Sequence, residues 1–125
     1  MARKVLIIVG KERSLEYVDK EEYTNVYLIN EFDELFDLDT LLNHKLRARK
    51  IISELQNILK YEYLKTQDYY FYLDCSIGIA IDILKFLKEN WKTTYHLITP
   101  IDLGKNKRKN KLTAWQELNI EDLLA

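Results

Sequence analysis

Cysteine, proline and glycine are all scarce in this chain, with one, one and three copies among 125 residues. A single cysteine excludes an internal disulfide framework and gives no zinc motif, and it makes the reducing cytoplasm the expected location. The three glycines form neither the GxGxxG of dinucleotide binders nor the GxxxxGK[ST] of phosphate loops. The sequence therefore supports neither class of cofactor, and we expect none.

Long apolar runs and metal-binding patterns are missing as well. No run approaches the length of a membrane helix, and the stretch Met1–Gly10 is too short for a signal peptide. The sequence has no HExxH, no pair of histidines at metal spacing and no acidic triplet typical of a two-metal nuclease. We expect neither membrane association nor a metal requirement.

Charge is nearly balanced, with a net value of −1, but residues 104–111 (GKNKRKNK) carry five basic side chains and no acid. A neutral protein with one basic segment favours a local contact with an anion over the coating of long DNA. Lys105 and Lys107 are the candidate ligand contacts in this segment. Taken alone, the segment is explained more simply as a solvated loop.

Four short runs rich in apolar and β-branched residues predict strands. The first is continuously apolar, which is typical of a strand buried on both faces in a parallel sheet. Gly10 marks the end of this first strand. We expect the single proline, Pro100, to end the fourth strand. The predicted strands are Lys4–Val9, Asn25–Asn30, Tyr69–Asp74 and Thr94–Thr99.

Helical spacing of apolar residues predicts two long helices between these strands. One runs from Thr40 to about Tyr63 with Asp39 or Thr40 as its N-cap, and the other covers Ile77–Trp91, which is apolar around most of its circumference. The polar segment Lys11–Tyr23 has room for one or two helical turns. A capping-box pattern at Thr113–Gln116 predicts a final short helix over residues 113–124.

Strands and helices alternate, so the fold class is α/β. We expect residues 1–125 to form one domain, a small Rossmann-like three-layer sandwich with a mainly parallel central sheet of about four strands and a C-terminal helix. No internal repeat or linker divides the chain.

Ligands of open α/β sheets bind beyond the carboxyl ends of the strands, where helix N-termini also offer free amides to anions. This rule selects four segments, in which glycine allows a close approach and the polar side chains can contact a ligand. A surface turn explains the first segment equally well, and N-capping is the simpler role for Ser76. The candidates for ligand contact are Gly10, Lys11, Glu12, Arg13, Asn30, Glu31, Asp74, Ser76, Gly78 and Thr99.

His44 lies in the apolar stripe of its helix, one turn from the N-terminus, with Arg47 close by. If this helix follows the second strand, His44 lies at the edge of the predicted site. A packed core histidine is the alternative. Cys75 has no base beside it in the sequence and is interpreted as a packing residue.

Val5–Gly10 followed by Lys11, together with the strand end Leu73-Asp74-Cys75-Ser76-Ile77-Gly78, resembles the Rossmann-like sensor domains of CRISPR systems and the related ring nucleases. Ile77 stands where a second glycine is common in that pattern. The resemblance implies a stand-alone, metal-independent ring nuclease of antiviral defence. Such an enzyme cleaves cyclic oligoadenylate by attack of a 2′-hydroxyl on the phosphodiester.

Under this resemblance His44, Lys11 and Arg47 are the catalytic candidates, and a homodimer holds the cyclic ligand beneath the basic segment 104–111. Two other functions remain open on the residues alone. The chain could be a non-catalytic nucleotide-binding or adaptor domain, or a small RNA-binding protein that uses its tyrosines and basic segment. Against the last, Tyr69, Tyr70 and Tyr72 are more typical of strand packing than of base stacking.

Overall fold

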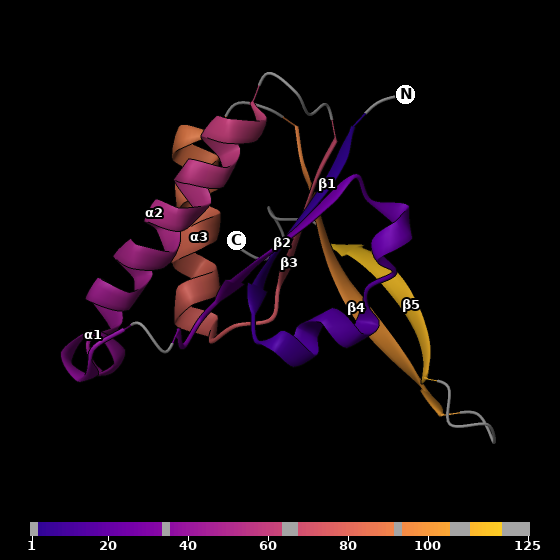
Figure 1. Cartoon of the computed structure of the whole chain (residues 1–125), viewed down its shortest axis with the longest axis horizontal. Helices are drawn as coiled ribbons and strands as arrows, with labels where there is room; N and C mark the ends of the chain where they lie inside the picture. The colour runs from indigo at the N-terminus through magenta and orange to yellow at the C-terminus, as the bar shows by residue number, and fades with distance from the viewer. Residues whose placement is uncertain (1–2, 34–35, 64–67, 92–93, 106–110, 119–125) are drawn as a thin grey trace.

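The computed structural model describes residues 3–33, 36–63, 68–91, 94–105 and 111–118. It contains one five-stranded sheet in the order β2-β1-β3-β4-β5, in which only β5 is antiparallel to its neighbour (Figure 1). The strands are β1 (Lys4–Gly10), β2 (Asn25–Asn30), β3 (Asp68–Leu73), β4 (His96–Lys105) and β5 (Lys111–Leu118). The predicted class, α/β with a mainly parallel sheet, is confirmed.

Side chains of β1 alternate between two hydrophobic cores, as expected for a strand buried on both faces. Val5, Ile7 and Val9 pack in the core that also contains residues of α2 (His44–Glu62) and α3 (Ile77–Asn90). Leu6 and Ile8 belong to the core on the other face. All five side chains are completely buried. β1 is therefore the central element on which both outer layers pack.

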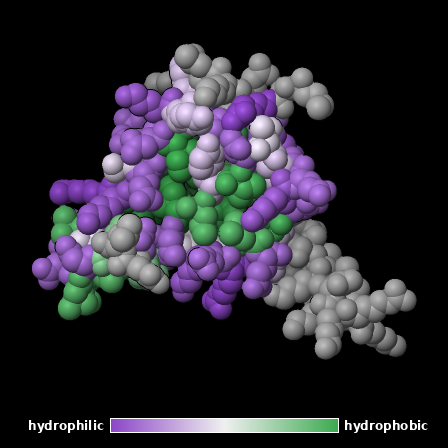
Figure 2. Space-filling view, in the orientation of Figure 1, coloured by the Kyte–Doolittle hydropathy of each residue, from purple (hydrophilic) through white to green (hydrophobic). Residues whose placement is uncertain are grey.

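The two outer layers differ in thickness. Helices α2 and α3 cover one face of the sheet, whereas the 3₁₀ segments η1 (Glu12–Tyr17) and η2 (Lys20–Glu22) cover the other (Figure 1). Apolar side chains gather in a central band between these layers, with hydrophilic residues outside (Figure 2). The helical turns predicted within Lys11–Tyr23 are thus confirmed, and they supply the third layer.

The strongly apolar character of α3 is explained by its packing against both the sheet and the neighbouring helix α2. Ile79, Ile83 and Leu87 are completely buried, and Leu84 is nearly so. Burying such side chains contributes roughly 1.5–3 kcal/mol each. Only the first turns present apolar residues to solvent, of which Ile77 is the most exposed at 79%. No helix in the described part of the chain is long and apolar enough to cross a membrane.

The predicted helix from Thr40 to Tyr63 is divided in two at Asn43. The short helix α1 (Leu38–Leu42) is capped by Asp37, whose carboxylate accepts a hydrogen bond from the Thr40 N–H at 2.7 Å. Asn43 then adopts an extended conformation and caps α2 by accepting from the Leu46 N–H at 3.2 Å. The predicted caps, Asp39 and Thr40, were wrong because both residues lie inside α1, while Asp37 and Asn43 cap the two helices.

The C-terminal part differs more from the prediction. Residues 113–118 belong to strand β5 and not to a helix, and residues 119–124 lie outside the described chain. Trp115 explains the change, because its ring packs edge-on against Tyr72 with centroids 5.3 Å apart. This burial against the sheet outweighs the local capping-box pattern.

Pro100 does not end the fourth strand either. The register between β3 and β4 runs only to the pair Tyr72 and Ile98, whereas β4 continues beside β5 as far as Lys105. A proline is tolerated where a strand lacks a neighbour on one side. Both ends of the predicted basic loop 104–111 lie in strands, since Lys105 ends β4 and Lys111 begins β5, and residues 106–110 lie outside the described residues.

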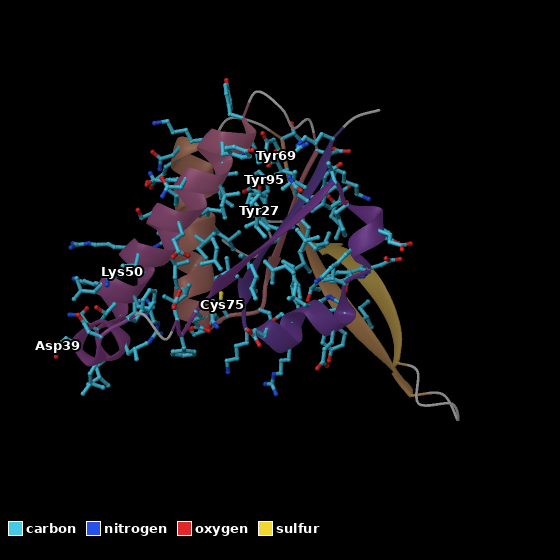
Figure 3. The ribbon with its side chains drawn as sticks, in the orientation of Figure 1. Tyr27, Asp39, Lys50, Tyr69, Cys75 and Tyr95 are labelled. Atoms are coloured by element: carbon cyan, nitrogen blue, oxygen red, sulfur yellow. The ribbon has the colours of Figure 1, made fainter. Side chains whose placement is uncertain are left out.

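A buried carboxylate fixes the amino end of the sheet. Glu62, the last residue of α2, is completely buried and accepts hydrogen bonds from Arg3 Nε at 2.9 Å and from the Tyr27 hydroxyl at 2.6 Å. The Tyr69 hydroxyl donates a hydrogen bond to the backbone carbonyl of Glu62 at 3.2 Å. Tyr27 and Tyr69 both lie between the helical layer and the sheet at this end (Figure 3). Burial and the nearby Glu62 raise the pKa of Tyr27 to about 12.

We predict that Glu62→Ala lowers the free energy of unfolding by about 3–5 kcal/mol, because Arg3 and Tyr27 lose a buried partner. Urea denaturation measures this change. Glu54→Ala, on the solvent-exposed side of the same helix, is the matched control and should change stability by no more than about 0.5 kcal/mol. Equal effects of the two variants would contradict the assigned role of Glu62.

Candidate functional site

The direction in which the chain adds strands to the sheet reverses between β1 and β3. From β1 the chain passes through η1 to β2 on one side, whereas β3 lies on the other side of β1 and leads into α3. The ends of these strands are level, because Val9 pairs with Leu73 and Gly10 pairs with Asn30. Such a switch point opens a crevice at the carboxyl ends of the strands. The predicted segments that follow β1, β2 and β3 meet there.

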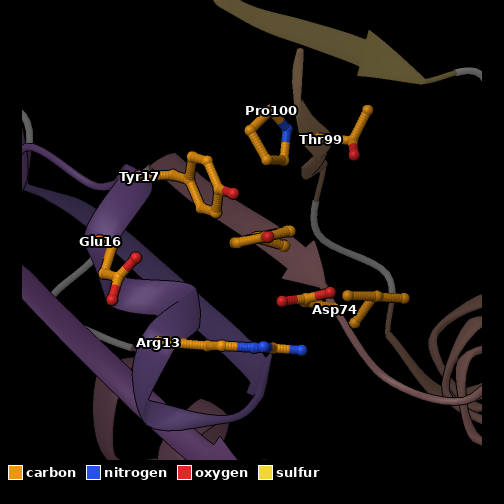
Figure 4. A pocket seen from close by; sticks show the side chains of 8 residues that line it. Arg13, Glu16, Tyr17, Asp74, Thr99 and Pro100 are labelled. Carbon is orange, nitrogen blue, oxygen red and sulfur yellow. The ribbon is translucent and has the colours of Figure 1, made fainter. Parts of the chain in front are cut away.

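Two adjoining depressions occupy this end of the sheet. The smaller has a volume of about 330 Å³ and the larger about 670 Å³, within the range of small-molecule sites. They share Arg13 and Asp74. The smaller is also lined by Lys11, Glu31, Phe32, Cys75 and Ser76, and the larger by Glu16, Tyr17, Tyr72, Leu73, Thr99 and Pro100 (Figure 4).

Ser14 joins the two strand ends. Its hydroxyl donates to Asp74 Oδ2 at 2.7 Å and accepts from the Lys11 N–H at 3.1 Å. A Cβ at Gly10 would lie 2.6 Å from Ser14 Oγ and 2.9 Å from the Asp74 carbonyl oxygen, so only glycine leaves room for this contact. Gly10 therefore serves the packing of the site and not a ligand. Ser14, which sequence reasoning missed, is completely buried among charged neighbours.

Lys11 and Arg13 supply the positive charge of the site. Both side chains are exposed, and neither forms an ion pair with another described residue. Arg13 extends from η1 toward the side of the larger depression that carries Asp74 (Figure 4). Lys11 Nζ lies 5.6 Å from the centre of the Phe32 ring. These cations can attract an anionic group to the shared region.

Glu31 performs the capping role that the sequence assigned to the Ser76 hydroxyl. The Glu31 carboxylate is almost completely buried and accepts a hydrogen bond from the Ser76 N–H at 3.0 Å. Ser76 occupies the N-cap position of α3, but its side chain makes no capping bond. Its hydroxyl instead borders the smaller depression. A carboxylate at this helix end is favoured by the helix dipole.

Arg47 lies behind the site and lines neither depression. Its Nη1 donates to the Leu41 carbonyl at 2.9 Å, and its Nη2 lies 3.7 Å from Glu31 Oε1. The guanidinium also lies 4.8 Å from the centre of the Phe32 ring. Arg47 thus holds Glu31 and Phe32 in place. This arrangement does not support its predicted catalytic role, since these contacts turn the guanidinium toward the protein.

His44 also lies apart from the depressions. Its Nε2 is 3.1 Å from Asp82 Oδ2, and its ring covers Gly78 so closely that a Cβ there would lie 2.7 Å from Cε1. Gly78 therefore admits the His44 ring and lines neither depression. The structure brings Lys11 and Ser76 together as expected but leaves His44 beside Gly78 and Asp82 of α3, outside the lining of both depressions. The connection at Asn43, which the sequence did not predict, changes the start of α2.

The other predicted contacts fall into three groups. Thr99 lines the larger depression. Asn30 accepts a hydrogen bond from the Phe32 N–H at 2.9 Å and so shapes the turn after β2, while Glu12 lines neither depression. Lys105 ends β4, and Lys107 lies outside the described residues.

Two protonated groups limit the chemistry of the site. Burial, reinforced by the nearby carboxylates of Glu31 and Asp74, raises the pKa of the Cys75 thiol to about 12. Burial and Asp74 also raise the pKa of Tyr72. Both groups stay protonated at neutral pH, so neither is a nucleophile or base there. The exposed carboxylate of Asp74, between the depressions, is the group placed to accept a proton.

Within the described residues, no three His, Cys, Asp or Glu side chains gather where they could hold a metal ion. Comparison with known proteins gives no match to any family model, curated protein or solved structure. The chemistry of the site is therefore argued from its geometry.

We predict that the Cys75 thiol of the folded protein reacts with iodoacetamide at pH 8 at least about 100-fold more slowly than an unperturbed cysteine, because so little of it is thiolate. Mass spectrometry follows the labelling. The same chain unfolded in urea is the control and should label rapidly. Equal rates in the folded and unfolded chain would contradict the raised pKa.

Proposed function

We propose that this chain is a ring nuclease that binds a cyclic oligoadenylate at the switch point between β1 and β3 and cleaves it without a metal ion. The observation that supports this most is the position of Lys11 and Arg13, two exposed cations without an ion-pair partner among the described residues, at the edge of a switch-point depression. A phosphodiester is an anion that fits such a pair. A cytoplasmic location agrees with this substrate.

In the proposed reaction, the ribose 2′-hydroxyl oxygen attacks the adjacent phosphorus and the bond to the 5′ oxygen breaks. The 2′-hydroxyl proton passes to the Asp74 carboxylate, and the 5′ oxygen takes a proton from solvent. The product is a linear oligoadenylate with a 2′,3′-cyclic phosphate and a 5′-hydroxyl. Lys11 and Arg13 stabilise the additional negative charge on phosphorus in the transition state.

This assignment replaces His44 with Asp74 as the proton acceptor. Ser14 fixes the Asp74 carboxylate through the 2.7 Å hydrogen bond, which limits its rotation. Holding the acceptor and the cations in one geometry supplies the positioning that in-line attack requires. Arg47 has an indirect, positioning role, because it holds Glu31 at the N-terminus of α3.

We further propose that two copies of the chain bind one ring, since a ligand with rotational symmetry fits a two-fold dimer. Most apolar residues of α3 are buried, so the contact would use exposed leucines of α1 as well as Ile77. Leu38 and Leu42 are 68% and 77% exposed, and an apolar group is visible at the position of α1 (Figures 1 and 2). Light scattering tests this directly, and a mass of 15.0 kDa with ligand bound would exclude the dimer.

A second candidate function is nucleotide binding without cleavage. The hydrogen bond that Asp74 accepts from Ser14 favours it, because it gives the carboxylate a structural role as well. RNA binding through the tyrosines of β3 has less support. Tyr69 and Tyr72 are buried, and Tyr70 stacks on His96 with centroids 4.7 Å apart.

Incubation of cyclic tri-, tetra- and hexaadenylate with the protein in EDTA, followed by chromatography and mass spectrometry, tests cleavage. We predict a linear product with a cyclic phosphate from at least one ring. Lys11→Ala and Arg13→Ala should each slow cleavage on the order of 100-fold, because each removes a donor to the developing charge.

The matched control is Lys20→Ala, which removes an exposed lysine of η2 that lines neither depression. This variant and His44→Ala should keep nearly full activity. Rings that stay intact with EDTA and with added Mg²⁺ would refute the nuclease. Cleavage that needs His44 and not Lys11 would refute this assignment of the site.

A further inference from the structure

The larger depression differs in character from the smaller one. Its upper part in Figure 4 contains the ring of Tyr17 together with Thr99 and Pro100, and its lower part contains Arg13 and Asp74. The smaller depression, in contrast, combines the cations with Ser76 and backbone at the start of α3. Flat apolar surfaces beside hydrogen-bonding groups are typical of sites that bind an aromatic heterocycle.

The floor of this depression is rigid. Tyr72 is only 4% exposed, and Trp115 packs edge-on against its ring at 5.3 Å. The nearby Asp74 carboxylate is held by the Ser14 hydroxyl through the 2.7 Å hydrogen bond. Tyr17, by comparison, is half-buried on η1. A planar ligand would therefore stack on Tyr17, with Arg13, Glu16 and Asp74 along its edge.

Those groups include both hydrogen-bond acceptors and hydrogen-bond donors. Asp74 and Glu16 provide carboxylate acceptors, and Arg13 provides N–H donors. Adenine offers a matching edge, since its exocyclic amine donates and the adjacent ring nitrogen accepts. Hypoxanthine carries an oxygen in place of that amine and would face a carboxylate with another acceptor. The edge of the depression thus distinguishes the two bases.

We infer that the larger depression is a purine-base subsite in which Tyr17 stacks on adenine and Asp74 accepts a hydrogen bond from its amine. The inference rests on the proposed function in one respect, namely that the phosphate attacked by the 2′-hydroxyl belongs to a neighbouring nucleotide of the ring and lies on the side of Lys11 and Arg13. Because both depressions share Arg13 and Asp74, a base and a neighbouring phosphate can occupy them together.

Calorimetric titration with adenosine 5′-monophosphate, inosine 5′-monophosphate and inorganic phosphate tests the subsite. We predict that the adenosine compound binds about 10-fold more tightly than the inosine compound, as expected for one correctly paired base edge. Tyr17→Ala should weaken binding of the adenosine compound about 10-fold through lost stacking, while Tyr17→Phe should preserve it. Tyr61→Ala, an exposed tyrosine of α2, is the control and should bind as the unmodified chain does.

Asp74→Asn provides a second and independent test. The asparagine amide can donate to the inosine oxygen, so the preference for adenosine should fall at least several-fold even if total affinity changes little. Circular dichroism verifies that each variant is folded. Equal affinities for the two nucleotides in the unmodified chain, or binding no tighter than that of phosphate, would overturn the subsite.

These results are separable from those on cleavage. A chain that prefers the adenosine compound but leaves every cyclic ring intact keeps the subsite and loses the nuclease. A chain that cleaves rings but binds the two monophosphates equally keeps the nuclease and loses the subsite.

Discussion

The hydrogen bond from Ser14 to Asp74 is the contact on which the site depends. It connects the turn after β1 to the turn after β3 across the switch point, at 2.7 Å and with Ser14 completely buried. Gly10 makes it possible by leaving no Cβ in the way. Without this bond, neither the cations that follow Gly10 nor the Asp74 carboxylate would have a fixed position, and the two depressions would not share a wall.

A second layer of contacts supports this arrangement. The Glu31 carboxylate occupies the N-terminus of α3, and Arg47 holds it there while packing on Phe32. The buried acid is therefore paired with an internal base, and Lys11 and Arg13 are the cations that line the depressions. The acidic and basic residues of the site nearly balance in number, but its solvent-exposed cations are Lys11 and Arg13.

Local patterns sufficed to predict the parallel strands and the meeting of their polar carboxyl ends, because burial on both faces of β1 and the polar residues after each strand are visible in the sequence. The predicted capping box failed because the environment of Trp115 against Tyr72 depends on tertiary packing. The position of His44 could not be predicted for a similar reason. Asn43 restarts the helix, and the pairing of His44 with Asp82, 38 residues away, cannot be inferred from helical spacing. Ser14 gave no signal beyond its place among charged residues.

The central claim is that a nucleotide phosphate binds at the switch point between β1 and β3. Backbone amide NMR of the isotopically labelled chain, titrated with cyclic tetraadenylate, tests it most directly. The account predicts that the largest shift changes fall on residues 10–17 and 74–78, with Lys11 and Ser76 among them. No change at those amides, with the largest effects instead around Tyr63 and Trp91 at the far ends of α2 and α3, would contradict it.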